Sequence, residues 1–315
     1  MMCRKLYEKY TELPSPELLQ YILNEINESD EEKLQHNETL MVEWIKWQPH
    51  FPRNIASDVI RTFLRGTKHN LDRAKRKLEN YLSARHLYQE VYLNRFPLTK
   101  DILQAMDVVN IASMPKLTKN GCRLLFFSLN ITDPSKFSTG SMAKLFFMLS
   151  DLTLILDQPV AGHIAVLDAA GMEPAHISRW LGTDLKKGIT LMRQAYPFRV
   201  KGIHVVNSPP FVKNLSSLVV PLLHQKIHDV IHFHKSYDNI QDTFGTDNIP
   251  KEYGGDLKSL RELTLKSYEA LQENAGWFET QENVKIVDVP KKIEFNLSHK
   301  EFFGVDGSFR QLKID

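Results

Sequence analysis

The chain of 315 residues has little of what several large classes of protein require. Its only two cysteines, Cys3 and Cys122, exclude a disulfide scaffold and are too few for a structural zinc site. No apolar run reaches the ~20 residues that cross a bilayer, and the charged first residues lack the apolar core of a secretory signal. Lysine and arginine exceed aspartate and glutamate by only 40 − 38 = 2, so no basic field indicates a nucleic-acid binder. We expect a soluble, reduced, cytoplasmic protein that binds no nucleic acid.

The common catalytic motifs are also missing. There is no phosphate-binding glycine loop of either usual type and no G-x-S-x-G elbow. Cys122 lies in an apolar run without a histidine placed to activate it, and Asp168 at a strand end is interpreted as a turn or cap residue. His224 and His228 have metal-ligand spacing on a helix, and His232 and His234 follow on one side of an expected strand. No cysteine lies nearby, and we interpret all four as ordinary polar or partly buried residues. We predict no enzyme, cofactor or metal.

The chain is organised in two patterns. The first ninety residues show helical periodicity in three stretches: 38–48, a second beginning near Ile55 with Asn54 as N-cap, and a third opening after Asn70. The third stretch carries a run of charges interpreted as a solvated face: Arg73, Lys75, Arg76 and Lys77. From Cys122 onward strands and helices alternate, which predicts parallel pairing and an α/β layer fold.

The expected strands and helices can be placed by their residue ranges. Strands are expected at 123–129, 163–168, 202–207 and 230–234, and helices at 138–157, 177–195, 211–225 and 257–274. The helix at 138–157 is apolar on most faces, which predicts burial. We divide the chain into a helical module (1–95), an α/β domain (96–258) and a C-terminal helix with a tail (259–315).

Five blocks, in order, resemble the CRAL-TRIO lipid-transfer family. They are IRTFLRGTKHNLDRAKRKLENYL at 60–82, GHIAVLDAAGMEPAH at 162–176, YPFRVKGIHVVNSP at 196–209, KI with IHFH at 226–227 and 231–234, and IPKEYGG at 249–255. The ending FFGVDGSFRQLKID is similar to the tail of the family's insect branch, often called alpha-tocopherol-transfer-protein-like. The resemblance implies a mixed, largely parallel sheet whose covering helices enclose a pocket for one lipid.

Carried onto this sequence, the resemblance implies a set of ligand-contacting residues. The pocket wall would comprise Phe146, Phe147, Ser150, His163, Leu167, Trp180, Leu191, Tyr196, Phe198 and Ile203. Ser150 would contact a lipid head group, or alternatively bond back to its own helix. A lid helix over 209–225, weakened by Pro221, would add Val212, Leu215, Leu218 and Leu223.

The resemblance also implies a basic cleft for phosphoinositide beside the lid. Arg199, Lys201 and Lys226 match three basic positions, whereas Val230 and Thr67 depart from two others. General attraction to anionic membranes is therefore expected rather than specific phosphoinositide recognition.

The sequence thus predicts a monomeric cytoplasmic carrier that holds one hydrophobic molecule and exchanges it at membranes. Tocopherol-like, retinoid or carotenoid lipids are the ligands that the resemblance implies. Two alternatives stay open: a phosphoinositide-dependent sensor or trafficking adaptor, and an enzyme of unfamiliar type.

Overall fold

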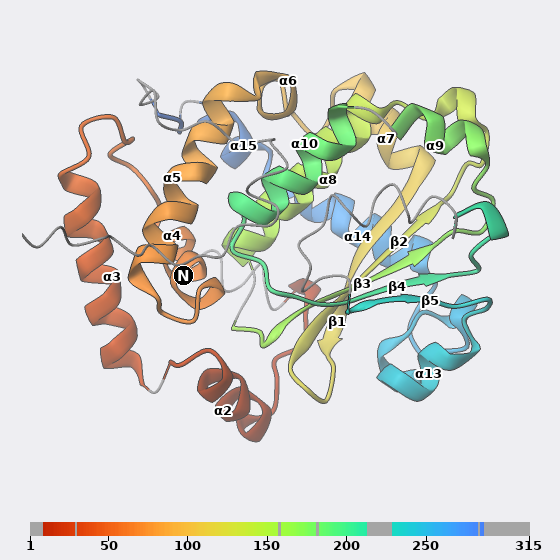
Figure 1. Ribbon diagram of the computed structural model, residues 1–315, viewed down its shortest axis with the longest axis horizontal. Helices are drawn as coiled ribbons and strands as arrows, with labels where there is room; N and C mark the ends of the chain where they lie inside the picture. Colours follow the sequence, from red (N-terminus) through yellow and green to blue (C-terminus); the bar gives the residue numbers. More distant parts are fainter. Residues whose placement is uncertain are drawn as a thin grey trace, which may run out of the picture.

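A computed structural model describes residues 9–28, 30–156, 159–180, 183–212, 229–282 and 284–286. Helices gather at one end of the molecule and a five-stranded sheet with its own helices forms the other (Figure 1). No helix within these residues combines the length and the apolar character that crossing a bilayer would need.

The N-terminal region is helical, as predicted. Its elements are α2 (Pro16–Glu25), α3 (Glu31–Lys46), α4 (Ser57–Gly66), α5 (Leu71–Leu87) and α6 (Gln89–Tyr92). The helix predicted to open after Asn70 begins at Leu71, and Asn70 caps it by accepting a hydrogen bond from the Arg73 amide. The prediction for Asn54 is wrong, because α4 begins at Ser57 after Ala56 and has no side-chain cap.

The sheet has the order β1-β2-β3-β4-β5. Its strands are β1 (Val109–Leu117), β2 (Cys122–Leu129), β3 (Gly162–Asp168), β4 (Val200–Val206) and β5 (Ile231–Phe233). β1 pairs with β2 antiparallel and every later neighbour pair is parallel, which confirms a mixed, largely parallel sheet. β1 and the preceding α7 (Lys100–Val108) were not predicted from the sequence.

Helices follow the strands as α/β alternation requires. After β2 come η1 (Pro134–Lys136) and the buried α8 (Thr139–Leu156), and after β3 come α9 (Pro174–Trp180) and α10 (Thr183–Gln194). The prediction of a single helix over 177–195 is wrong, because the structure has two helices there, α9 and α10. After β5 come α13 (Asp238–Phe244), η3 (Thr246–Asn248), η4 (Lys251–Tyr253), α14 (Leu260–Glu273) and α15 (Ala275–Gln281).

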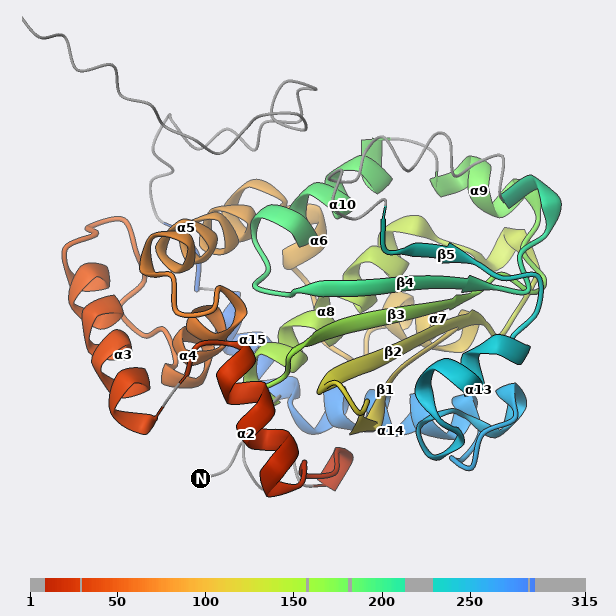
Figure 2. The same cartoon turned by 60° about the horizontal axis from the view of Figure 1, so that its bottom comes forward.

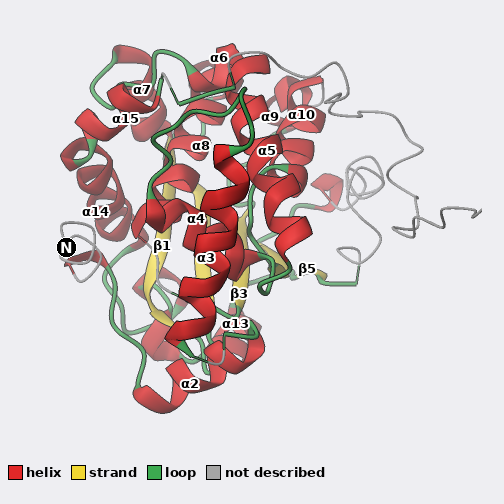
Figure 3. Ribbon diagram, turned by 90° about the vertical axis from the view of Figure 1, so that its left-hand side faces the viewer, coloured by secondary structure: helices red, strands yellow, loops and turns green. Residues whose placement is uncertain are grey.

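The two faces of the sheet belong to different hydrophobic clusters. One face packs on a cluster with α13, η4 and the start of α14, and its strand residues are fully buried: Met114, Leu124, Phe126, Val166 and Val206. The other face lies toward α7, α8 and α10 (Figure 2). The cluster on this side also contains residues of α3, α4 and α5, so the N-terminal helices and the sheet region share one core (Figure 3).

Candidate functional site

The sheet face toward α8 carries an apolar surface in register. One row across the strands is Leu125, Ala165, Ile203 and Ile231, and the next is Phe127, Leu167, Val205 and Phe233. All but Val205 are half-buried or exposed, up to 36% for Phe233, whereas Leu124, Phe126, Val166 and Val206 on the opposite, closed face are fully buried. An apolar sheet face that its helices leave partly open can line a site for an apolar molecule.

The predicted wall residues divide between this face and the core behind it. Leu167 and Ile203 lie on the open face, and Phe146 and Phe198 are partly buried. Phe147, Leu191 and Tyr196 are fully buried in the cluster shared with the N-terminal helices. Trp180 is the last residue of α9, and its side chain lies outside the described part.

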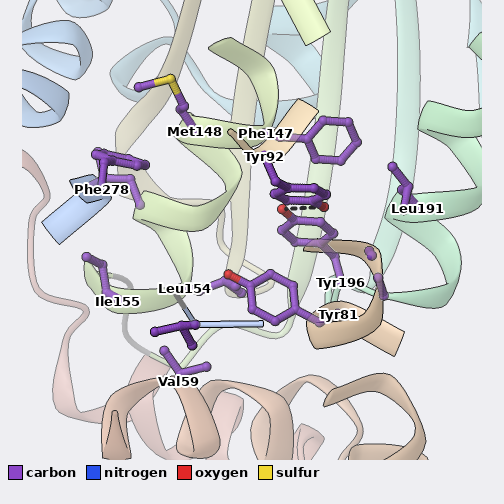
Figure 4. Packing of buried hydrophobic residues seen from close by; sticks show 14 of the residues in the cluster. Val59, Tyr81, Tyr92, Phe147, Met148, Leu154, Ile155, Leu191, Tyr196 and Phe278 are labelled. Atoms are coloured by element: carbon purple, nitrogen blue, oxygen red, sulfur yellow. Dashed lines mark hydrogen bonds between the residues drawn. The ribbon is translucent and has the colours of Figure 1, made fainter. Parts of the chain in front are cut away.

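Aromatic rings connect the buried residues to the open face. Tyr196 stacks on Phe198 with ring centroids 5.5 Å apart, and Phe198 in turn lies 4.8 Å from the His163 ring on β3. Phe147 contacts Tyr196 from the α8 side at 5.6 Å (Figure 4). This series of rings forms a rigid end wall for the apolar surface.

The hydroxyl of Ser150 is bonded to its own helix. It donates to the Phe146 carbonyl at 2.9 Å, the alternative that the sequence analysis left open. Thr153 does the same with the Leu149 carbonyl at 3.0 Å. A head-group contact by Ser150 would have to compete with this internal bond.

A fully buried carboxylate organises the core beneath the rings. Asp151 of α8 accepts hydrogen bonds from Arg85 at 3.1 Å and Arg95 at 2.7 Å. The hydroxyls of Tyr81 and Tyr196 also donate to it, at 3.0 and 2.7 Å. These partners come from α5, the segment after α6 and the turn before β4, so Asp151 joins the N-terminal helices to the α/β domain.

Lys77 makes a second connection between the two parts, and its interpretation as a solvated residue is wrong. Its ammonium donates to the carbonyls of Arg193, at 2.7 Å, and Tyr196. Burial, followed by repulsion from Arg73, Arg193 and Arg76, lowers the pKa of Lys77 to about 7. In the unfolded chain the pKa of Lys77 has its ordinary value of 10.5. Between pH 7 and 10.5 the unfolded chain therefore binds more protons than the folded chain does.

Stability should consequently rise with pH across that window because of Lys77. We expect the free energy of unfolding to increase by on the order of 2 kcal/mol between pH 7 and 9 in the wild type, and this increase to disappear in Lys77→Met. Urea unfolding at the two pH values measures it. Lys75→Met on the same helix is the control and should retain the increase; an equal pH dependence in Lys77→Met would show that Lys77 titrates normally.

The predicted basic cleft is only partly formed. Arg199 turns inward and donates to the carbonyls of Arg65, Val160 and Ala161, the last at 3.2 Å, and its burial lowers its pKa to about 10. This geometry corrects the prediction of a surface-directed Arg199. Thr67 is buried, and its hydroxyl donates to the Phe63 carbonyl at 2.9 Å.

Within the described residues, the exposed Lys201 and the half-buried Lys68 lie near Arg199, at what we call the basic corner. Lys201 of β4 and Lys68 after α4 lie 3.9 and 3.7 Å from Glu25. Lys68 also lines a surface hollow with Asn24, Asn27, Lys33 and His69. The corner is therefore mainly basic, with Glu25 as an opposing charge.

Part of the prediction falls on residues that the structure does not describe. Leu215, Leu218, Leu223, Pro221 and Lys226 lie within 213–228, outside the described residues. Val212 is half-buried at the last described position before them, and Val230 is half-buried after them.

The histidines and Asp168 have local partners. Nδ1 of His204 lies 3.0 Å from Nε2 of His234, and the His204 and His232 rings are 4.8 Å apart. No group of three metal-binding side chains in the described part could hold an ion. Asp168 accepts hydrogen bonds from the Ala170 amide, the Asn207 side chain and the Tyr253 hydroxyl, which confirms its role as a turn residue.

Sequence reasoning missed two features. It interpreted 123–129 as one apolar run and did not separate Leu125 and Phe127 from the residues on the closed face, although alternate residues on a strand face opposite sides. It noted that Asp151 interrupts α8 but did not identify its arginine partners. An aspartate inside an apolar helix is the signal for such a pair, because a buried charge needs one.

Comparisons with known proteins agree with this architecture. Residues 109–255, from β1 to the end of the Gly254-Gly255 turn, match the CRAL/TRIO domain model, and residues 30–102 match the model described as a Pinta-like UBA domain. The chain is 28% identical over 250 residues to the alpha-tocopherol transfer protein-like protein of Mus musculus, covering 78% of this chain and 71% of the relative. It is 26% identical over 202 residues to clavesin-1 of Xenopus laevis, covering 62% and 59%.

A solved structure, that of Sfh5, aligns with a TM-score of 0.48 at 13% identity over 78% of this chain and 98% of that one. The match to the CRAL/TRIO domain model extends over all five strands of the sheet, and residues 109–255 are therefore similar to that domain.

Proposed function

We propose that this chain carries one hydrophobic lipid against the open face of its sheet and exchanges it at membranes. The observation that supports this most strongly is the difference between the two faces of the same sheet. Leu124, Phe126 and Val166 on the closed face are fully buried, whereas Leu125, Phe127 and Leu167 on the other face are not. Leaving large apolar side chains partly exposed costs about 25 cal/mol per Å². A bound apolar molecule would recover that energy.

The finer parts of the proposal follow from the resemblance. Tocopherol, retinoid and carotenoid lipids are the ligand classes, the segment 209–225 is the lid, and the ligand-contacting residues are those of the wall and lid described above. The division at residues 95 and 258 and the placement in the insect branch belong to the same proposal. A monomeric, cytoplasmic carrier needs no covalent chemistry, because a lower affinity in a membrane-opened state suffices for release.

Lipids extracted from the purified chain test the carrier directly. Mass spectrometry should find one dominant lipophile at close to one molecule per chain, and retinol or α-tocopherol should bind saturably by fluorescence. If neither lipid saturates and no lipophile co-purifies, the carrier function is wrong.

Membrane attraction should depend on Lys68 and Lys201. Each lysine near an anionic surface contributes roughly 1 kcal/mol, and Glu25 reduces this. We expect the Lys68→Ala, Lys201→Ala double variant to bind phosphatidylserine vesicles roughly three- to tenfold more weakly at low salt, with lipid binding unchanged. Co-sedimentation at two salt concentrations measures it.

The control for the membrane experiment is Lys266→Ala, an exposed lysine on α14. It should leave vesicle binding unchanged, because the loss in the double variant should be specific to the corner. If the two variants bind alike at low salt, the corner does not face the membrane.

A further inference from the structure

His163 is a half-buried histidine whose two ring nitrogens are shielded from solvent. Neither ring nitrogen has a hydrogen-bond donor or acceptor in the described part of the chain. Its ring packs on Phe198 at 4.8 Å, and its backbone amide donates to the Arg199 carbonyl at 2.7 Å. The backbone is thus fixed by the sheet while the imidazole lacks hydrogen bonds. Buried polar groups normally have such bonds.

The position of His163 relates it to the open sheet face. It pairs with Arg123 of β2 in the register, two residues before the row that contains Leu125 and Ala165. Alternate residues share a face, so His163 lies at the end of the apolar surface, about 7 Å along the strand from the first apolar row. One end of the surface is therefore polar, and the rest is apolar.

The two arginines near His163 do not supply a partner. Arg123 donates to the carbonyls of Met114 and Pro115 at 2.9 and 3.0 Å, and Arg199 donates to the three carbonyls described above. Burial, with repulsion from Arg199 and Arg123, lowers the pKa of His163 to about 3. The imidazole is consequently neutral at pH 7 and offers one donor and one acceptor.

A hydroxyl is the lipid group that fits this arrangement. It can accept from the protonated ring nitrogen or donate to the other one, whereas a hydrocarbon end could do neither. The hydroxyls of Ser150 and Thr153 on α8 are already bonded to their own helix.

We propose that His163 hydrogen-bonds the hydroxyl group of a lipid alcohol and so fixes its orientation, with the apolar part along Leu125, Ala165 and Ile203. This assignment rests on the proposed carrier function. It specifies in addition that the ligand has a hydroxyl group and that His163 binds it. His163 is then a specificity residue, because it discriminates between lipids of the same shape that differ in one oxygen.

The test uses two matched pairs of lipids: retinol with deoxyretinol, and α-tocopherol with its 6-deoxy analogue. For each pair, the ratio of the deoxy lipid's dissociation constant to that of the alcohol measures preference for the hydroxyl. We expect His163→Phe, which keeps a ring but removes both nitrogens, to reduce this ratio about tenfold for the pair that binds. Thr153→Val, which removes an α8 hydroxyl that is bonded to its own helix, is the control and should leave the ratio at the wild-type value.

The possible results separate this assignment from the carrier function. If an alcohol binds but His163→Phe has the wild-type ratio, His163 does not contact the hydroxyl and only this inference fails. If none of the four lipids binds the wild type saturably, the carrier function fails together with the inference.

A second measurement needs no variant. In a two-bond ¹H–¹⁵N spectrum of the wild type, the alcohol should shift the His163 ring nitrogens and the deoxy lipid should not. Equal shifts with both lipids would overturn the assignment, since a merely structural histidine would respond to occupancy alone.

Discussion

Replacing Asp151 by alanine should lower the free energy of unfolding by about 3–5 kcal/mol. The substitution leaves two almost fully buried guanidinium groups, those of Arg85 and Arg95, without their carboxylate. The hydroxyls of Tyr81 and Tyr196 lose an acceptor at the same time. Since whole domains are stable by only about 5–15 kcal/mol, much of the stability should disappear. Urea or thermal unfolding measures the change.

Two further variants serve as comparisons for Asp151→Ala. Asp101→Ala removes an exposed carboxylate 3.8 Å from Lys144 and should cost less than about 1 kcal/mol, as surface ion pairs do. Asp151→Asn keeps one acceptor oxygen and should fall between the two. A loss below about 1 kcal/mol in Asp151→Ala would contradict a central role for this carboxylate.

Replacing Ala165 by tryptophan should reduce the affinity for retinol or α-tocopherol at least tenfold. Ala165 lies between Leu125 and Ile203 in the register, so a large ring at this position would occupy the space that the proposal gives to the ligand. Fluorescence titration measures the affinity, and urea unfolding checks the fold. Because the alanine is half-buried rather than tightly enclosed, we expect a stability cost within the 1–3 kcal/mol typical of overpacking.

Leu265→Trp is the matched control for the added ring. Leu265 is 50% exposed on α14, and the first turns of that helix pack on the closed face of the sheet. The Leu265→Trp variant should bind retinol or α-tocopherol with the affinity of the wild type. Wild-type affinity in Ala165→Trp, with the fold intact, would mean that the ligand does not lie on the open face.

The sequence alone predicted the α/β alternation and most of its strands, but not β1 or α7. Ordered motifs such as YPFRVKGIHVVNSP indicated the resemblance, and local signals such as the helical periodicity after Asn70 and the apolar run after Cys122 placed α5 and β2 correctly. These signals are local because caps and periodicity depend on neighbours within a few residues. β1 was not predicted because it is an antiparallel edge strand that contains Pro115, and the apolar pattern of such a strand is weaker than that of a buried central strand.

Only the tertiary structure decided what individual polar side chains do. Arg199, Lys77 and Ser150 were assigned by residue type and neighbours in sequence, yet each donates to backbone carbonyls, from segments distant in sequence for Arg199 and Lys77. Asp151 bonds Arg85, which is 66 residues away in the sequence, and the ring nitrogens of His163 have no hydrogen-bond partner among the described residues. A charged or polar group is satisfied by whatever the fold brings within about 3 Å, and that distance is set by packing between elements rather than by the sequence around the residue.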